Sequence, residues 1–269
     1  MSTIGFVGSG NMAEALVKGI IGTGLYTPEN VFVSDVRADR LSLLSESYGA
    51  VPVQSNAELA ARVDTLVLSI KPQNMIDALN SIKEAIGAET LVISIAAGIK
   101  VANITAVLGD MAIIRVMPNT PALIGEGASA LFANERAKPL LEKAMSMFGS
   151  VGKAVIVENE DLIDAVTAVS GSGPAYYFLL MEEMVKSGIK LGLPETVAKD
   201  LVLQTAKGAG MLAAAADKNG ESPARLRQKV TSPGGTTEAA LKVFTEGKIG
   251  ELILAGITRA RDRGRELSK

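Results

Sequence analysis

The chain has 269 residues, of which 48% are hydrophobic, and its 27 Lys and Arg against 29 Asp and Glu give a formal net charge of −2. Because no positive excess exists to attract nucleic acid or an anionic membrane, we expect a small-molecule partner, with no nucleic-acid or membrane partner. The complete absence of Cys and His excludes thiolate nucleophiles, Ser/His/Asp triads and zinc sites with those ligands, and no metal site is predicted.

The beginning of the chain runs directly into a strand-like segment, without the basic region and apolar core of a signal peptide. The apolar runs are broken by Gly, Pro or charge well before the roughly 18 residues that a membrane span needs. A cytoplasmic protein is therefore expected. The length favours two modest domains over one large one.

The first part of the chain, residues 1–159, alternates short β-branched runs with helical segments, which is typical of parallel βαβ units. The predicted strands cover residues 3–7, 31–34, 65–70, 90–95 and 113–117. The predicted helices between them cover residues 12–21, 40–48, 74–86 and 101–108.

Residues 160–269 contain no strand signal and are rich in Ala, Leu, Met and Glu with helical periodicity, which predicts an all-helical domain. Breaks rich in Gly and Pro occur at residues 170–174, 192–194 and 232–235. They predict one helix from Pro174 to about Leu191 and another that begins near Thr236 or Thr237. The apolar stretch 181–216 is compatible with burial within one chain or against a partner.

A glycine loop follows the first predicted strand and precedes the first predicted helix, with Gly8, Gly10 and Ala13 in the G-x-G-x-x-A frame. Gly8 permits the turn, Gly10 lets the backbone approach a pyrophosphate, and the N–H groups at the helix start face the anion. The alternative is a purely structural turn. The prediction is a dinucleotide site formed by Gly8, Ser9, Gly10, Asn11 and Met12.

The second strand ends in Ser34 and Asp35, and Asp35 follows Ala13 by 22 residues, close to the usual spacing of a ribose-binding acid. Alone, Asp35 favours NAD. However, Ser34, Arg37 and Arg40 together suit a 2′-phosphate, because guanidinium groups pair well with phosphate oxygens. Asp35 also reads as a cap of the next helix. We expect NADPH as the cofactor, with NADH as the alternative.

Small and flexible residues follow the next two predicted strands, where open parallel sheets bind ligands. They leave room for a flat ring, although they also read as ordinary strand-ending residues. We predict cofactor contacts from Ser69, Ile70, Lys71 and Pro72 and from Ala96, Ala97 and Gly98.

Three further motifs occur in order: Arg115 to Pro121, Ser170 to Tyr176, and Val230 to Thr237. With them, the chain closely resembles the pyrroline-5-carboxylate reductase family over nearly its whole length. The resemblance implies an α/β fold, with an N-terminal Rossmann-type, mainly parallel sheet covered by helices on both faces, followed by an all-α C-terminal domain. It implies that the C-terminal domain dimerises, so that the protein is a homodimer or a ring of dimers. The implied reaction is NAD(P)H-dependent reduction of 1-pyrroline-5-carboxylate to L-proline.

The third motif suits a carboxylate, because a Gly-Gly turn at a helix start exposes backbone N–H groups. By similarity, the substrate is bound by Ser232, Gly234, Gly235, Thr236 and Thr237, with the catalytic Thr237 hydroxyl beside the imine nitrogen. In a chain without His, that hydroxyl is a plausible proton relay. Alternatively, Thr236 or Thr237 simply caps the helix.

The resemblance further implies that Asn56 lies near the adenosine and residues 117–120 near the nicotinamide. Asn56 also reads as a helix N-cap, and Tyr176 reads as a packed aromatic or a reserve proton donor. The arginines near the C-terminus, at positions 259, 261, 263 and 265, predict a solvated helix end.

Two other functions, a β-hydroxyacid dehydrogenase and a dinucleotide sensor, fit the sequence less well. A β-hydroxyacid dehydrogenase would need a Lys early in the helix after Pro174, whereas the first Lys there is Lys186. A dinucleotide sensor without catalysis leaves the third motif unexplained.

Overall fold

The structure is a computed structural model that describes residues 2–267 and divides into two compact units. The first unit comprises the chain up to Pro174 and the segment from Arg259 on, and the second comprises Ala175–Thr258. None of the helices described is long and apolar enough to cross a membrane.

The first unit is built on one sheet with the strand order β3-β2-β1-β4-β5-β6-β7-β8. All neighbouring strands are parallel except β6 and β7. The strand order reverses between β1 and β4, so the carboxyl ends of these strands form the switch point at which such sheets bind ligands. The strands are β1 (Ile4–Val7), β2 (Val31–Ser34), β3 (Val51–Pro52), β4 (Thr65–Leu68), β5 (Leu91–Ser94), β6 (Ala112–Met117), β7 (Gly127–Ala133) and β8 (Gly152–Ile156).

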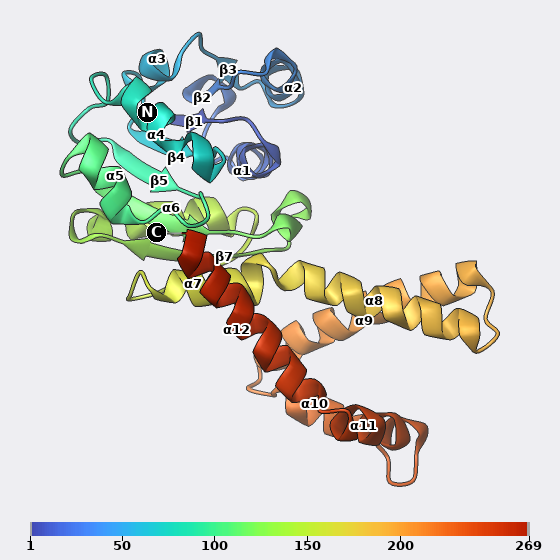
Figure 1. Cartoon of the computed structure of the whole chain (residues 1–269). Coiled ribbons are helices and arrows are strands. Elements are labelled where there is room, and N and C mark those ends of the chain that lie inside the picture. Colours follow the sequence, from blue (N-terminus) through green and yellow to red (C-terminus); the bar gives the residue numbers. More distant parts are fainter. Residues whose placement is uncertain (1, 268–269) are drawn as a thin grey trace. The chain divides into compact units, whose positions relative to one another are not determined.

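Helices cover both faces of this sheet, because successive strand residues point to opposite sides (Figure 1). Phe6 packs with one face and the neighbouring Val7 with the other. The face of Phe6 is covered by α1 (Asn11–Gly22), α2 (Ala38–Tyr48) and α6 (Leu141–Gly149). The face of Val7 is covered by α3 (Asn56–Ala60), α4 (Met75–Ile82) and α5 (Val101–Leu108). Short 3-10 helices are η1 (Pro28–Asn30), η2 (Pro72–Asn74), η3 (Thr120–Ile124) and η4 (Glu135–Leu140).

The expected fold class is confirmed, and the five predicted strands and four predicted helices of this unit are all present. The strand 31–34 and the helix 101–108 have the predicted bounds, whereas α4 ends at Ile82, earlier than predicted. Sequence patterns did not reveal β3, β7, β8 or α6. The strand β7 reads GASALFA and contains no β-branched residue, which explains the missing signal.

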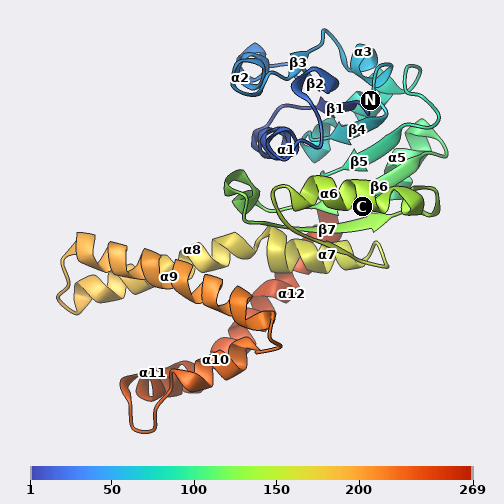
Figure 2. The same cartoon turned by 180° about the vertical axis from the view of Figure 1, so that it is seen from behind.

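The chain from Leu162 on is helical, as expected. A short α7 (Leu162–Val166) continues into the π-helical turn η5 (Thr167–Gly171) and then α8 (Gly173–Lys190). The remaining helices are α9 (Glu195–Asp217), α10 (Pro223–Lys229), α11 (Thr236–Glu246) and α12 (Ile249–Leu267). Figures 1 and 2 both show α8 and α9 side by side, and a Cβ added at Gly188 would lie 3.2 Å from Cβ of Ala198. Gly188 therefore permits the close approach of these helices.

The end of α12 belongs to the first unit, and the expectation of a solvated end is confirmed for Arg265, whose side chain is 52% exposed. Its Nε lies 3.8 Å from Oδ2 of Asp164, whose side chain is only 5% exposed. Arg259 and Arg263 instead pair with Glu266 on the exposed surface of the same helix.

Candidate functional site

The glycine loop connects β1 to α1 in a conformation that requires glycine. Gly8 has a φ of +94°, and an added Cβ would lie 2.7 Å from the carbonyl oxygen of Ser69. The N–H of Gly8 donates to the carbonyl of Ser34, and the Ser69 hydroxyl donates to the carbonyl of Gly8. The loop is therefore tied to the ends of both neighbouring strands.

The start of α1 fits a pyrophosphate. Its N-cap is Gly10, which supplies no side-chain cap, so the N–H groups of the first turn remain available to an anion. A Cβ added at Gly10 would meet no atom of the described chain within 4 Å, which leaves a cradle for a close ligand. The buried hydroxyl of Ser9 has no hydrogen-bond partner among the described residues. This orphaned donor, the cradle and the uncapped helix together match a bound phosphate group.

Asp35 and Arg40 hold the peptide groups of Ser9 from two sides. Oδ2 of Asp35 accepts the N–H of Ser9 at 2.6 Å, and its Oδ1 accepts the N–H of Arg37 at 2.9 Å. The Nε of Arg40 donates to the carbonyl of Ser9 at 2.7 Å. Arg40 also pairs with Glu14, so the expectation that it joins Arg37 around a 2′-phosphate does not match its position. The side chain of Arg37 is 54% exposed and remains accessible.

Ser34 and Asn56 lie together, as expected of residues around one adenosine site. The Ser34 hydroxyl donates to Oδ1 of Asn56 at 2.8 Å, and Nδ2 of Asn56 donates to the Ser81 hydroxyl at 3.0 Å. The N-cap of α3 is Ser55, whose side chain accepts the N–H of Glu58. Asn56 is therefore not the helix cap that was considered as an alternative.

The segments after β4 and β5 lie at the same sheet edge as the glycine loop, since β1, β4 and β5 are neighbouring parallel strands. Ile95 continues the pairing of these strands through its N–H to the carbonyl of Leu68. Gly98 has a φ of +76°, which explains a glycine there. All the residues predicted to contact the cofactor are thus brought to one edge of the sheet.

The first two family motifs meet through Asn119. Its Nδ2 donates to the carbonyl of Ser170 at 3.1 Å, and its Oδ1 accepts the N–H of Ala128 at 2.8 Å. A Cβ at Gly171 would lie 2.6 Å from Cε of Met117, so glycine allows the π-helical turn to approach β6. The adjoining Tyr176 lies in the first turn of α8 and is 38% exposed.

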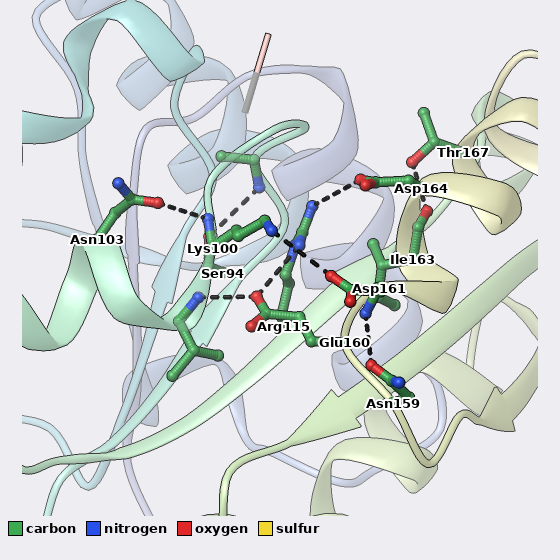
Figure 3. A network of polar contacts seen from close by, with 12 residues as sticks. Ser94, Lys100, Asn103, Arg115, Asn159, Glu160, Asp161, Ile163, Asp164 and Thr167 are labelled. Carbon is green, nitrogen blue, oxygen red and sulfur yellow. Dashed lines mark hydrogen bonds and ion pairs between the residues drawn. The ribbon is translucent and has the colours of Figure 1, made fainter. Parts of the chain in front are cut away.

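A buried ion network joins β6 to the chain at the start of α7. Figure 3 shows Arg115 between Glu160 and Asp164. The Arg115 side chain is 2% exposed, and Nη1 and Nη2 lie 3.1 and 3.7 Å from the two carboxylates. Glu160 also accepts the N–H of Val101 at the start of α5. Sequence analysis assigned no role to this arginine, because its partners lie 45 residues or more further along the chain.

The third motif lies in the second unit, at the start of α11. Gly235 is the N-cap, so neither Thr236 nor Thr237 caps the helix, and that alternative is wrong. Gly234 has a φ of +71°, and its N–H donates to Glu238 at 2.7 Å. A hollow of about 450 Å³ is lined by residues that include Gly234, Gly235, Glu238 and Lys242, but not Thr236 or Thr237.

Comparisons with known proteins agree along the whole chain. A family model described as pyrroline-5-carboxylate reductase dimerisation matches residues 160–267, and one described as NADP oxidoreductase coenzyme F420-dependent matches residues 3–98. The pyrroline-5-carboxylate reductase of Pseudomonas aeruginosa is 43% identical over 100% of this chain and 98% of its own.

Solved structures agree as well. A pyrroline-5-carboxylate reductase from Coxiella burnetii superposes with a TM-score of 0.94 at 40% identity, covering 100% of this chain and 99% of the other. The pyrroline carboxylate reductase of Plasmodium falciparum, solved with NADP bound, gives a TM-score of 0.87 at 29% identity, covering 100% and 98%. The glycine loop, the three motifs and these full-length matches agree, and the chain belongs to the pyrroline-5-carboxylate reductase family.

Proposed function

We propose that this protein reduces the cyclic imine 1-pyrroline-5-carboxylate to L-proline with NAD(P)H, the last step of proline biosynthesis. The observation that carries the proposal is the uncapped start of α11 at Gly235, in a chain whose glycine loop leads into a second uncapped helix start at Gly10. The first suits the substrate carboxylate and the second suits a pyrophosphate. The reaction needs both.

The residues of the third motif have different roles toward the substrate: carboxylate binding, formation of the turn and proton transfer. The N–H of Thr236 receives the carboxylate, while Ser232 and Gly234 shape the turn, since the carbonyl of Ser232 accepts the N–H of Gly235. The bound nicotinamide supplies a hydride to the imine carbon. The Thr237 hydroxyl donates a hydrogen bond to the imine nitrogen and relays the proton that this nitrogen gains, with water as the final source.

We propose NADPH as the preferred cofactor. Both oxygens of Asp35 already accept backbone N–H groups, which weakens its case as a receptor for the ribose 2′-hydroxyl of NADH. Arg37 is exposed at the N-cap of α2, where its guanidinium and the helix start both favour a 2′-phosphate. The NADP in the Plasmodium falciparum structure supports the same preference.

We propose residues 1–159 as the dinucleotide-binding domain and residues 160–269 as the substrate-binding and dimerisation domain. The helices of the second unit expose large apolar side chains, which a second copy of the chain would cover. Examples are Phe178 at 61%, Leu180 at 52%, Leu212 at 57% and Leu252 at 69%. Light scattering distinguishes this homodimer from a ring of dimers.

The test of function is the rate of NADPH and NADH oxidation by the full chain with 1-pyrroline-5-carboxylate. We expect turnover with both cofactors and a higher kcat/KM with NADPH. Folded protein that binds the dinucleotides but turns over neither would overturn the proposed reaction.

A further inference from the structure

Two arginines, Arg37 and Arg40, follow β2 closely in sequence, and their different contacts indicate different roles. Resting on the proposed NADPH-dependent reaction, we propose that Arg40 is a positioning residue that holds the glycine loop in its binding conformation, whereas Arg37 alone reads the 2′-phosphate. The cofactor preference then depends on Arg37, and the affinity for any dinucleotide depends on Arg40.

Ser9, the residue between the two glycines, is held by hydrogen bonds on both sides of its peptide groups. Its N–H donates to Asp35 at 2.6 Å and its carbonyl accepts from Nε of Arg40 at 2.7 Å. Gly8 and Gly10 give this segment an unusually wide choice of backbone conformations. Two charge-assisted hydrogen bonds to one residue therefore select a single loop conformation among many.

Arg40 occupies a position in α2 that is unfavourable for a cation. It is the third residue of α2, where the helix dipole disfavours positive charge. Glu14 on α1 offsets this cost by pairing with Arg40 at 2.5 Å, and the side chain of Arg40 is only 13% exposed. The residue thus serves the loop and not the stability of its own helix.

Tyr48 completes the contact between α1 and α2 by donating its hydroxyl to Glu14 at 3.3 Å. Burial, together with the negative charge of Glu14, raises the pKa of Tyr48, which keeps the phenol protonated as a donor. Glu14 is therefore held in place by two donors, Arg40 and Tyr48. The side chain of Arg37 pairs instead with Asp35, its Nε lying 3.8 Å from Oδ1.

The two roles predict different losses. Both NADPH and NADH carry the pyrophosphate that the glycine loop receives, so loosening the loop weakens both equally. Only NADPH carries the 2′-phosphate, so removing its receptor weakens NADPH alone.

The experiment compares Arg40→Met with the matched variant Arg37→Met in the full-length enzyme. Calorimetric titration gives the Kd of NADPH and of NADH, and steady-state kinetics gives KM for each substrate. For Arg40→Met we expect about tenfold weaker binding of both cofactors with an unchanged NADPH/NADH ratio, since a charged hydrogen bond is worth about 1.5 kcal/mol. For Arg37→Met we expect about tenfold weaker NADPH binding and unchanged NADH binding. KM for 1-pyrroline-5-carboxylate stays the same in both.

Arg40→Lys provides the rescue test. One ammonium group cannot reproduce the separate bonds to Ser9 and Glu14, so binding should recover only in part, again equally for both cofactors. If Arg40→Met does not fold, Glu14→Gln tests the same cluster and should weaken both cofactors to a similar, smaller extent.

If Arg40→Met weakens the binding of NADPH alone, Arg40 contacts the 2′-phosphate. If it leaves the binding of both cofactors unchanged, the loop does not need Arg40 to hold its conformation. Either result overturns the proposal. If wild-type protein binds neither dinucleotide, the proposed function itself fails. An unaltered ratio in Arg37→Met would overturn the task assigned to Arg37.

Discussion

Arg115 and Glu160 form a buried ion pair, with Nη1 of the arginine 3.1 Å from Oε1 of the glutamate. This pair connects β6 to the beginning of the helical part of the chain, and Nη2 of Arg115 also lies near Asp164 (Figure 3). Asp164 in turn lies 3.8 Å from the half-exposed Arg265. Burying such charges costs solvation energy that only their mutual pairing offsets. Arg115 and its carboxylate partners therefore each offset the cost of burying the others.

Arg115→Met should therefore lower the free energy of unfolding by about 3–5 kcal/mol, because it removes the cation of Glu160 and leaves the buried Asp164 with only the half-exposed Arg265. Urea denaturation at a fixed protein concentration measures the loss. The control is Arg136→Met, since Arg136 pairs with Glu89 and Asp110 while remaining 37% exposed. That variant should lose less than about 1 kcal/mol. An equal decrease in the free energy of unfolding in the two variants would show that burial does not determine how much the Arg115 network stabilises the protein.

Gly10→Ala should leave the fold intact and weaken dinucleotide binding. Gly10 has a φ of −71°, which alanine adopts without strain, and the added Cβ would meet no described atom. The methyl group instead enters the space for the pyrophosphate, and we expect about tenfold weaker NADPH binding, or about 1.4 kcal/mol. Thermal unfolding and titration measure the two effects separately. Gly22→Ala, at the far end of the same helix, should leave binding unchanged.

Thr237→Ala should lower kcat by about a hundredfold, the lower range of proton-transfer contributions, while leaving the Kd of NADPH nearly unchanged. Thr237→Ser should restore most of the rate, because it keeps the hydroxyl. Thr236→Ala is the matched control: it removes the neighbouring hydroxyl but preserves the backbone N–H. If turnover by Thr237→Ala equals that of the wild type, the residue has no part in the chemistry.

Asp64 should stabilise the protein only when ionised. The N–H of Thr3 donates to Asp64 at 2.9 Å, and this backbone hydrogen bond is the largest cause that lowers the pKa of Asp64 below its usual 3.8. A depressed pKa in the folded state adds stability above the unfolded value, and this stability is lost as pH falls through the lower folded value. Asp64→Asn should therefore be less stable than wild type at pH 7, and the difference should shrink below a pH of about 3.8. Urea midpoints across this range would detect it; a constant difference would contradict the assignment.

The sequence predicted those parts of the candidate site that are formed by consecutive residues. The glycine loop, the residues after β4 and β5 and the start of α11 each follow a local rule of turn or helix-start chemistry. The contacts between distant segments had no such signal. Arg40 reads locally as a phosphate ligand, and only the fold brings it to the carbonyl of Ser9, 31 residues away.

The same limit explains the elements that were missed. Strand β7 pairs antiparallel to β6 and consists largely of small residues, so neither βαβ alternation nor β-branching marks it. Arg265 lies in the solvated end of α12 as expected, but its contact with Asp164 had no local signal. Its partner Asp164 lies about a hundred residues earlier, beyond the reach of a local pattern.

The first unit is built from two separate pieces of the chain, with all of Ala175–Thr258 between them. On the ribosome, Asp164 therefore emerges long before Arg265, and the contact between them can form only after the second unit has been translated. All strands of the described sheet precede the second unit, so the sheet can form before the segment from Arg259 on joins the first unit.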